Sequence, residues 1–262
     1  MKPIYLRLIV LFGLLSIACT TKVSEWVLLN SEANMYTLVY FHKDAVPGTI
    51  QKQNDELGKT ISNANIQFTS LSKDNIDQPY YALYYKNRLF NKFTDYKELR
   101  NLTTSPLREK IAAELMTGKL CVMLYLKTDD KSKDDKGMQV LQNALNSSPF
   151  KEVIAFVELS KSNVEEAHFV SMLLNVEGDL KTIKEPMLFG VFGRFKALEP
   201  LLGEGITEEN INLMIHFLTA DCSCLIKDDL PGTDILFKND WDSPEPALVN
   251  KIIDANPSLE HM

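Results

Sequence analysis

From residue 36 onward, short β-rich runs alternate with amphipathic segments. The runs 36–41 (YTLVYF) and 66–71 (IQFTSL) are dominated by β-branched and aromatic residues, which predicts two strands. Between them, apolar residues recur at helical spacing over 49–62 and predict a helix. A hairpin over 80–93 is expected next, and the apolar spacing in 107–115 predicts a second helix.

The second half repeats this order with different lengths. The apolar runs 121–126 and 153–159 predict strands, and 138–145 and 164–176 predict helices. A further hairpin over 187–198 and a helix over 210–218 complete the repeat; these ranges are again read from apolar spacing. The pattern predicts an α/β fold of two tandem three-layer units, each with a mixed central sheet and flanking helices.

The first residues have the composition of a secretory signal. Lys2 and Arg7 precede a short apolar run over 8–15, and small residues lead to Cys19. The run is shorter than the roughly 20 apolar residues that span a membrane. This pattern resembles a bacterial lipoprotein signal, although Ser16 stands where that signal usually has leucine. The alternatives are an ordinary cleaved signal with Cys19 as a bystander, or an uncleaved anchor.

The lipoprotein resemblance implies that residues 1–18 are removed and that Cys19 carries diacylglycerol and an acyl chain such as palmitate. Two or three chains anchor a protein stably in a membrane, since each buried CH₂ contributes about 0.8 kcal/mol. Residues 19–32 are then expected to be a lipidated tether. Thr20, rather than aspartate, follows the cysteine. The expected location is the cell envelope, at the periplasmic face of the outer membrane of a Gram-negative bacterium.

The charge of the chain argues against nucleic acid as a partner. Removal of residues 1–18 reduces the 28 basic side chains to 26, against 35 acidic ones, which gives a net charge of −9. Binding to a phosphate backbone requires a basic face. No glycine-rich phosphate loop follows a predicted strand, so we expect no cofactor.

A proline stands directly before each predicted hairpin, Pro79 in the first half and Pro186 in the second. With the strand–helix–strand–hairpin–helix order, this resembles two tandem thioredoxin-like domains. The resemblance assigns 33–118 to the first domain and 119–222 to the second, and leaves 223–262 as a C-terminal extension.

The resemblance also implies cis peptide bonds at Gln78–Pro79 and Glu185–Pro186, because thioredoxin-like domains have a cis-proline at this place. Trans geometry at both bonds would favour another α/β sandwich. The first unit is reduced, since the segment 72–78 is too short to contain the crossover helix of the second unit.

Neither unit has the thioredoxin dithiol. That Cys-x-x-Cys follows the first strand, where a helix N-terminus stabilises a thiolate. The corresponding positions here are 42–48 (HKDAVPG) and 127–133 (KTDDKSK), and neither contains cysteine. The resemblance therefore implies a non-catalytic binding or assembly module, more a scaffold than an enzyme, whose partner is another envelope protein. An adhesin or nutrient-binding lipoprotein is a third possibility.

The remaining chemical candidate is Cys222-Ser223-Cys224. Such a pair can form a structural disulfide or pack unreacted, exchange disulfides with a partner, or hold a soft metal. Metal binding would need further ligands, for which Asp221 and His216 are candidates. The alternative function is therefore a thiol-disulfide oxidoreductase or a soft-metal chaperone.

Other side chains have simpler interpretations. Cys121 is expected to be a buried core thiol, His168 to lie at the edge of the core, and His42 to be a polar loop residue. The tyrosines of one predicted strand alternate between its faces, so half should pack inward and half could form a partner surface; they are Tyr80, Tyr81, Tyr84 and Tyr85. The tail after Cys224 is expected to fold back on the second unit.

Overall fold

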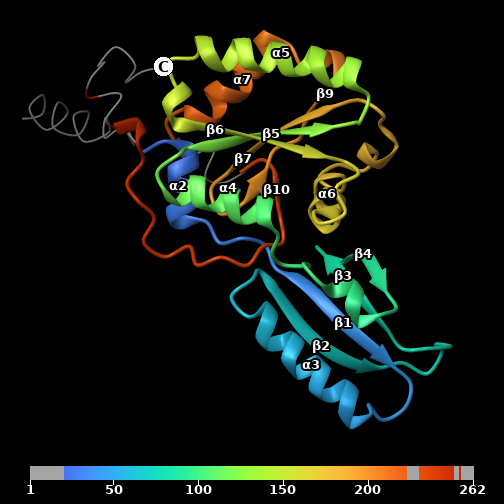
Figure 1. Cartoon of the computed structure of the whole chain (residues 1–262). Helices are drawn as coiled ribbons and strands as arrows, with labels where there is room; N and C mark the ends of the chain where they lie inside the picture. The colour runs from blue at the N-terminus through green and yellow to red at the C-terminus, as the bar shows by residue number, and fades with distance from the viewer. Residues whose placement is uncertain (1–20, 223–229, 251–253, 255–262) are drawn as a thin grey trace, which may run out of the picture.

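The computed structural model describes residues 21–222, 230–250 and 254, and these form a mixed α/β protein with two β-sheets (Figure 1). The prediction of an α/β fold with two sheets is thus confirmed. The first sheet has the order β2-β1-β3-β4. Its strands are β1 (Tyr36–His42), β2 (Ile66–Ser72), β3 (Tyr80–Tyr85) and β4 (Arg88–Phe93).

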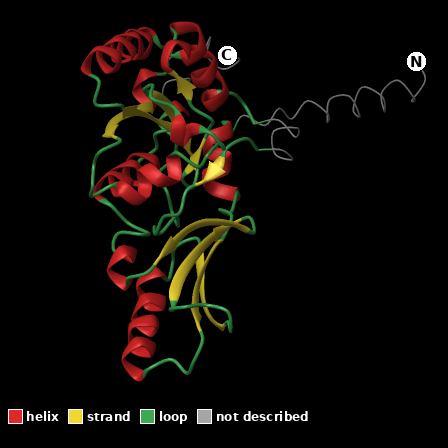
Figure 2. Cartoon of the chain, turned by 90° about the vertical axis from the view of Figure 1, so that its right-hand side faces the viewer, coloured by secondary structure: helices red, strands yellow, loops and turns green. Residues whose placement is uncertain are grey.

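In the first sheet, β1 lies between a parallel and an antiparallel neighbour. It runs parallel to β2, because helix α3 (Gly48–Ile61) crosses over between them, and antiparallel to β3. Helix α3 packs on one face, where Leu57 and Ile61 contact the buried side of the sheet. No helix of the described residues lies on the other face (Figure 2).

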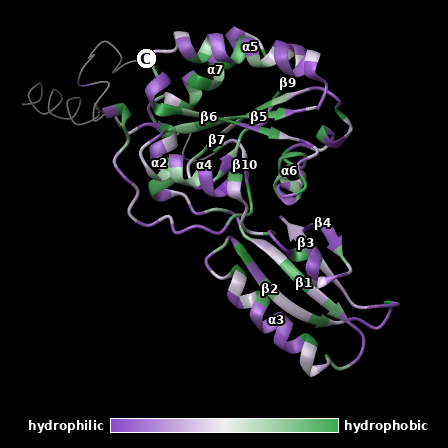
Figure 3. Ribbon diagram, viewed as in Figure 1, coloured by the Kyte–Doolittle hydropathy of each residue, from purple (hydrophilic) through white to green (hydrophobic). Residues whose placement is uncertain are grey.

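The second sheet is larger and is covered on both faces. Its order is β10-β8-β7-β5-β6, with β9 beside β7. The strands are β5 (Cys121–Lys127), β6 (Ile154–Ser160), β7 (Met187–Phe192), β8 (Lys196–Ala197), β9 (Leu201–Leu202) and β10 (Thr233–Asp234). Figure 3 shows hydrophobic colouring along β5 and β6, as expected for strands buried on both sides.

Four helices form the outer layers of this second unit. Helices α5 (Lys131–Ser147) and α7 (Glu208–Thr219) pack on the face that contains Met123 and Tyr125. Helices α4 (Pro106–Met116) and α6 (Ala167–Leu173) pack on the face that contains Val122 and Leu124. Short 3₁₀ turns complete the chain: η1 (Tyr96–Leu99), η2 (Lys151–Val153), η3 (Leu180–Thr182) and η4 (Gly203–Gly205).

The N-terminal segment is not the tether that the sequence predicted. Residues Val23–Asn30 form helix α2, which packs against α7 and β7. Val23 and Val27 are buried in the core of the second unit. Gly193 lies beneath this helix with a positive φ of 57°, and a Cβ there would lie 2.9 Å from Cβ of Val27. The close approach explains why a glycine occupies this turn.

Two further boundaries differ from the sequence prediction. Helix α4 was assigned to the first unit, but its residues Ile111 and Leu115 pack on β5 of the second sheet. Glu166 accepts a hydrogen bond from the Leu107 N–H and so ties the start of α4 to the second unit. Helix α5 begins seven positions before the predicted 138–145, because Asp130 caps its first turn.

The C-terminal tail contacts both units, whereas the sequence predicted a contact with the second unit alone. Strand β10 pairs antiparallel with β8, and Asp234 forms a buried ion pair with Lys196 at 2.8 Å. From the first sheet, the Tyr36 hydroxyl donates to the Asp234 carbonyl oxygen and Asn34 donates to its carboxylate. The tail therefore bridges both sheets.

The predicted cis-prolines are absent. No cis peptide bond occurs in the described residues, so the bonds before Pro79 and Pro186 are trans. The trans form is the lower-energy geometry at proline. At Pro186 it is compatible with strong local pairing, since Lys161 donates to the Glu185 carbonyl oxygen and Gly203 N–H donates to that of Pro186.

Candidate functional site

The N-terminus of α5 lies in the segment 127–133, which begins at the carboxyl end of β5 and contains no cysteine. Here the Asp130 side chain accepts hydrogen bonds from the N–H groups of Ser132 and Lys133. The buried Asp134 accepts three more, from Thr128 and Asp129. The Asp130 carboxylate therefore binds two of the N–H groups at this helix start, whereas Asp134 binds groups of the loop before it.

An ion pair connects this helix start to the residue before Pro186. Lys133 Nζ lies 2.5 Å from Glu185 Oε1, and hydrogen bonding to Glu185 raises the pKa of Lys133. Lys161 donates to the carbonyl oxygens of Ile183 and Glu185, and burial lowers its pKa. These contacts fix the backbone at Pro186 without any thiol.

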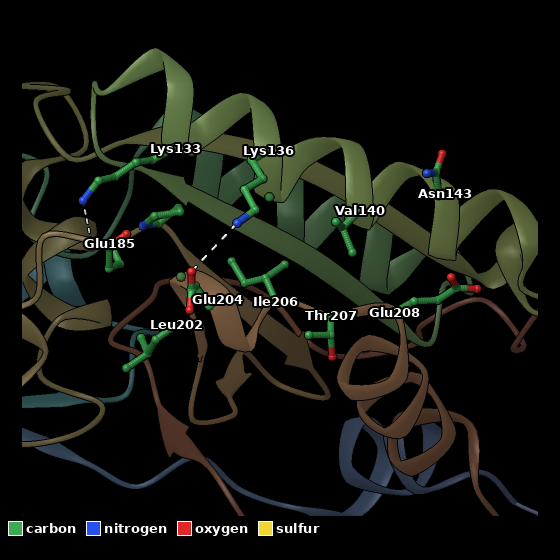
Figure 4. A pocket seen from close by; sticks show the side chains of 13 residues that line it. Lys133, Lys136, Val140, Asn143, Glu185, Leu202, Glu204, Ile206, Thr207 and Glu208 are labelled. Carbon is green, nitrogen blue, oxygen red and sulfur yellow. Dashed lines mark hydrogen bonds and ion pairs between the residues drawn. The ribbon is translucent and has the colours of Figure 1, made fainter.

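Beside this ion pair lies a pocket of about 910 Å³ between α5 and the segment 202–208 (Figure 4). Its apolar lining comes from Val140, Leu202 and Ile206, and charged groups such as Lys133 and Glu185 surround it. The volume is in the range of small-molecule sites. Among the residues that the structure describes, however, no group of three or more metal-ligating side chains gathers here or elsewhere.

The equivalent position in the first unit is simpler. Helix α3 begins after Pro47, with no side chain capping its first N–H groups. His42 Nδ1 lies 2.8 Å from the Asp44 carbonyl oxygen, and its ring stacks on Tyr40. This is the polar, structural role that the sequence predicted for His42.

A second candidate site, besides the pocket, is the uncovered face, by which we mean the face of the first sheet opposite α3. It consists of side chains from all four strands: Thr37, Val39, Phe41, Gln67, Thr69, Leu71, Tyr80, Ala82, Tyr84, Leu89 and Lys92. Their positions follow from the strand register, since side chains alternate between faces. The prediction for the tyrosines is confirmed, because Tyr81 is buried and bonded to Asn54 of α3 while Tyr80 and Tyr84 lie on the uncovered face.

Aromatic rings and lysines alternate on this face. The rings of Phe41 and Tyr80 lie 5.2 Å apart between centroids. Lys73 Nζ lies 5.1 Å from the Phe41 ring, and Lys92 Nζ lies 5.2 Å from the Tyr80 ring. Such cation–π contacts hold the lysine chains against the rings while their charges stay in solvent.

The cysteines occupy different environments. Cys121 is fully buried in β5, and burial raises the pKa of its thiol to about 12, so it is the inert core thiol that was predicted. Cys222 is also buried, and its N–H donates to the Thr21 carbonyl oxygen. Cys19 and Cys224 lie outside the described residues. The candidate ligand Asp221 pairs instead with Lys22, at 2.9 Å, and His216 is exposed.

Within the described part of the chain, no helix has the length and apolar character needed to cross a membrane.

Comparison with known proteins gives a weak structural similarity. No protein-family model matches the chain, and no curated protein matches it. Among solved structures, the chain is similar to the first two thioredoxin domains of Naumovozyma dairenensis Eps1p, at 14% sequence identity and a TM-score of 0.26. That match covers 78% of this chain and 97% of the other.

Two residues that organise the molecule were not found from the sequence. Arg108 is fully buried, although it lies in a helix whose other charged residues face solvent. Asp234 is buried in an ion pair, although the tail around it is rich in exposed aspartates. No local pattern marks either residue, since both are buried by segments that are distant in sequence.

Proposed function

We propose that this chain is a lipid-anchored envelope protein whose two units are thioredoxin-like modules that bind a protein partner and do not catalyse disulfide exchange. The strand order supports the thioredoxin-like assignment. In both sheets the first strand lies between the second and the third, parallel to the second and antiparallel to the third. The trans bonds before Pro79 and Pro186 count against the assignment, which rests on this strand order.

The observation that carries the non-catalytic function is the state of the α5 N-terminus. Asp130 accepts hydrogen bonds from two of its N–H groups, Asp134 accepts from the loop before it, and Lys133 is paired with Glu185. A thiol-exchange site needs an accessible, low-pKa cysteine at this point. The chain offers carboxylates and an ion pair in its place.

The rival function, thiol exchange or metal transfer through Cys222 and Cys224, receives less support. Cys222 is only 3% exposed and packs among the residues that hold α2. A buried thiol is a poor nucleophile. Reaction at Cys222 would therefore require the N-terminal segment to separate from α7.

An insulin-reduction assay with the purified mature chain tests the catalytic part of the proposal. We expect no rate above the dithiothreitol background, in both the wild-type chain and Cys222→Ser. A rate that is present in the wild type and lost in Cys222→Ser would establish the rival function.

Detergent-phase partitioning of the expressed full chain tests the anchor. We expect the wild type to enter the detergent phase and Cys19→Ser to remain in the aqueous phase. Equal partitioning of both chains would show that Cys19 carries no lipid, and it would leave the binding function to be tested separately.

A further inference from the structure

The uncovered face is an incomplete layer of the first unit. A sheet is stable when both faces are covered or when one face is polar. Here α3 covers one face (Figure 2). The other face exposes apolar side chains, with Leu71 47% and Leu89 49% exposed. The crossover between β2 and β3, which in the second unit contains α6, is too short here to supply a helix.

Two rows of large side chains cross the face. Phe41 and Tyr80 belong to one row, and Tyr84 and Leu89 belong to the other. Between the rows, Val39 and Ala82 are only 5% and 0% exposed, so the larger side chains around them close over this part of the face. Tyr80 and Tyr84 are four residues apart on one strand, so the rows are about 13 Å apart at roughly 3.3 Å per residue. An α-helix with side chains is about 10–12 Å across and would lie on top of both rows, as a layer like the one that α3 forms on the opposite face.

The charge of the face differs from that of the rest of the chain. Strands β1 to β4 contain no aspartate or glutamate. Residues 33–100 contain nine basic and seven acidic side chains, whereas the whole chain has a formal net charge of −7. Two lysines lie on this face, and neither forms an ion pair with any described residue: Lys73 and Lys92.

We propose that the uncovered face binds an amphipathic helix of a partner protein, with an apolar side that packs on the aromatic rings and acidic residues that pair with Lys73 and Lys92. The partner helix would supply the layer that the first unit lacks. This inference rests on the binding function proposed above and names its site and the chemistry of its partner.

The charges argue against a second copy of this chain as the occupant. In a twofold dimer the same patch faces itself, so the lysines of one copy would lie against those of the other. Like charges at such a contact destabilise it. An acidic helix instead gains charge-assisted contacts with Lys73 and Lys92.

The test uses two matched peptides and the mature chain with Cys19→Ser, so that lipidation plays no part. Both peptides are 18-residue amphipathic helices with leucine on one side; one has glutamate on the other side and its control has lysine. Fluorescence anisotropy should show that the glutamate peptide binds at least about tenfold more tightly than the lysine peptide, with affinity that falls as salt rises.

Variants then locate the site. The double variant Lys73→Glu/Lys92→Glu should weaken binding of the glutamate peptide about tenfold or more, and Tyr80→Ser should weaken it in a salt-independent way. The matched control is Lys52→Glu/Lys59→Glu on α3, where both lysines are exposed on the other side of the sheet; its affinity should stay within about twofold of the wild type. Circular dichroism checks that each variant is folded.

Four results would overturn the proposal: equal binding of both peptides, no effect of Lys73→Glu/Lys92→Glu in a folded chain, a dimer that this variant dissociates, or binding to phosphatidylglycerol vesicles that is as strong as binding to the peptide. The dimer would assign the face to a second copy, and the vesicle result would assign it to a lipid surface. Loss of detergent partitioning in Cys19→Ser concerns the lipid anchor alone, and it changes none of these conclusions about the uncovered face.

Discussion

The Nζ atom of Lys22 lies 2.9 Å from Oδ1 of Asp221, and the same two residues form an antiparallel β-bridge. Their contact joins the start of the described chain to the end of α7. Only Thr20 and Thr21 separate Lys22 from Cys19. A lipid on Cys19 would therefore stand within about 10 Å of extended chain from the folded second unit, at roughly 3.5 Å per residue.

Lys22→Met should loosen α2 while keeping its apolar contacts. Lys22 is 1% exposed, so its removal leaves Asp221 without its partner at the edge of the core. We expect a loss of about 1 kcal/mol in local stability, which corresponds to roughly fivefold faster hydrogen exchange in α2. The matched control is Lys136→Met, whose pair with Glu204 is almost fully exposed. Equal exchange in both variants would show that the Lys22 pair contributes nothing to the packing of α2.

Arg108 connects α4, the linker between the units and the C-terminal tail. All five of its N–H groups donate: to the Ser105 hydroxyl and to the carbonyl oxygens of Asn101, Leu102, Thr104 and Leu236. Burial lowers the pKa of the guanidinium to about 10, so it remains charged at neutral pH. The charge is neutralised locally by these oxygens and by the nearby Glu166.

Replacing Arg108 should therefore destabilise the contact between the two units. Arg108→Met leaves several buried carbonyl oxygens without donors, at about 1–3 kcal/mol each, so urea unfolding should show a loss of at least about 3 kcal/mol. Arg108→Lys should also lose stability, because an ammonium group cannot reproduce the five donors of the planar guanidinium. Lys110→Met, on the exposed side of the same helix, is the control. If Arg108→Lys were as stable as the wild type, the planar guanidinium would not be what holds these segments together.

His168 should make the interface between the units sensitive to acid. Its Nε2 atom lies 2.8 Å from the Glu98 carbonyl oxygen, and its ring packs against Phe93 of the first sheet. Burial lowers the pKa of His168 below its usual value of about 6.5. The unfolded chain then binds a proton more readily than the folded one, so stability falls as pH falls below about 6.5.

The measurement is the thermal midpoint at pH 7.5 and pH 5.0. Between these values the wild type should lose more stability than His168→Gln, because glutamine can donate to the Glu98 carbonyl oxygen but does not titrate. His216→Gln is the matched control, since His216 is exposed on α7. If His168→Gln and the wild type lose the same amount, protonation of His168 does not limit stability in this range.

The sequence could predict most strands because their signal is local. The runs 36–41 and 121–126 are apolar and have the length of a strand, which favours a buried strand over a helix, and the structure places strands there. The uncovered face also follows from local information, since the alternation of tyrosines in β3 and the short crossover before it are both visible in the sequence.

What the sequence could not predict depends on distant segments. Helix α2 looks like a linker because it is only eight residues long and its apolar residues do not form one helical stripe, and it is stabilised by α7 and β7 from the other end of the chain. The assignment of α4 to the second sheet likewise depends on Glu166 and on Arg108. The cis-prolines were an inference from the family resemblance, and the backbone of this chain does not follow it.

Gly137 and Tyr125 offer a direct test of how α5 packs over the pocket. Gly137 lies inside α5, where alanine would normally be more stable by about 0.5–1 kcal/mol. A Cβ at this position would collide with the Tyr125 hydroxyl oxygen, which donates to the Asp134 carbonyl oxygen. Gly137→Ala should therefore destabilise the chain by about 1–3 kcal/mol. Gly58→Ala, inside α3 with no neighbour within 4 Å of its Cβ, should be neutral or stabilising.

A double-mutant cycle separates this collision from any general effect of alanine. Tyr125→Phe removes the colliding oxygen, and the nearest remaining ring atom lies 3.2 Å from the new Cβ. The cost of Gly137→Ala should then fall by at least about 1 kcal/mol in the Tyr125→Phe background, which urea unfolding of the four chains measures as a coupling energy. A coupling energy near zero would mean that the glycine is needed for another reason. A coupling of the expected size would show that the tyrosine–helix contact, which holds the wall of the pocket in place, selects glycine at this position.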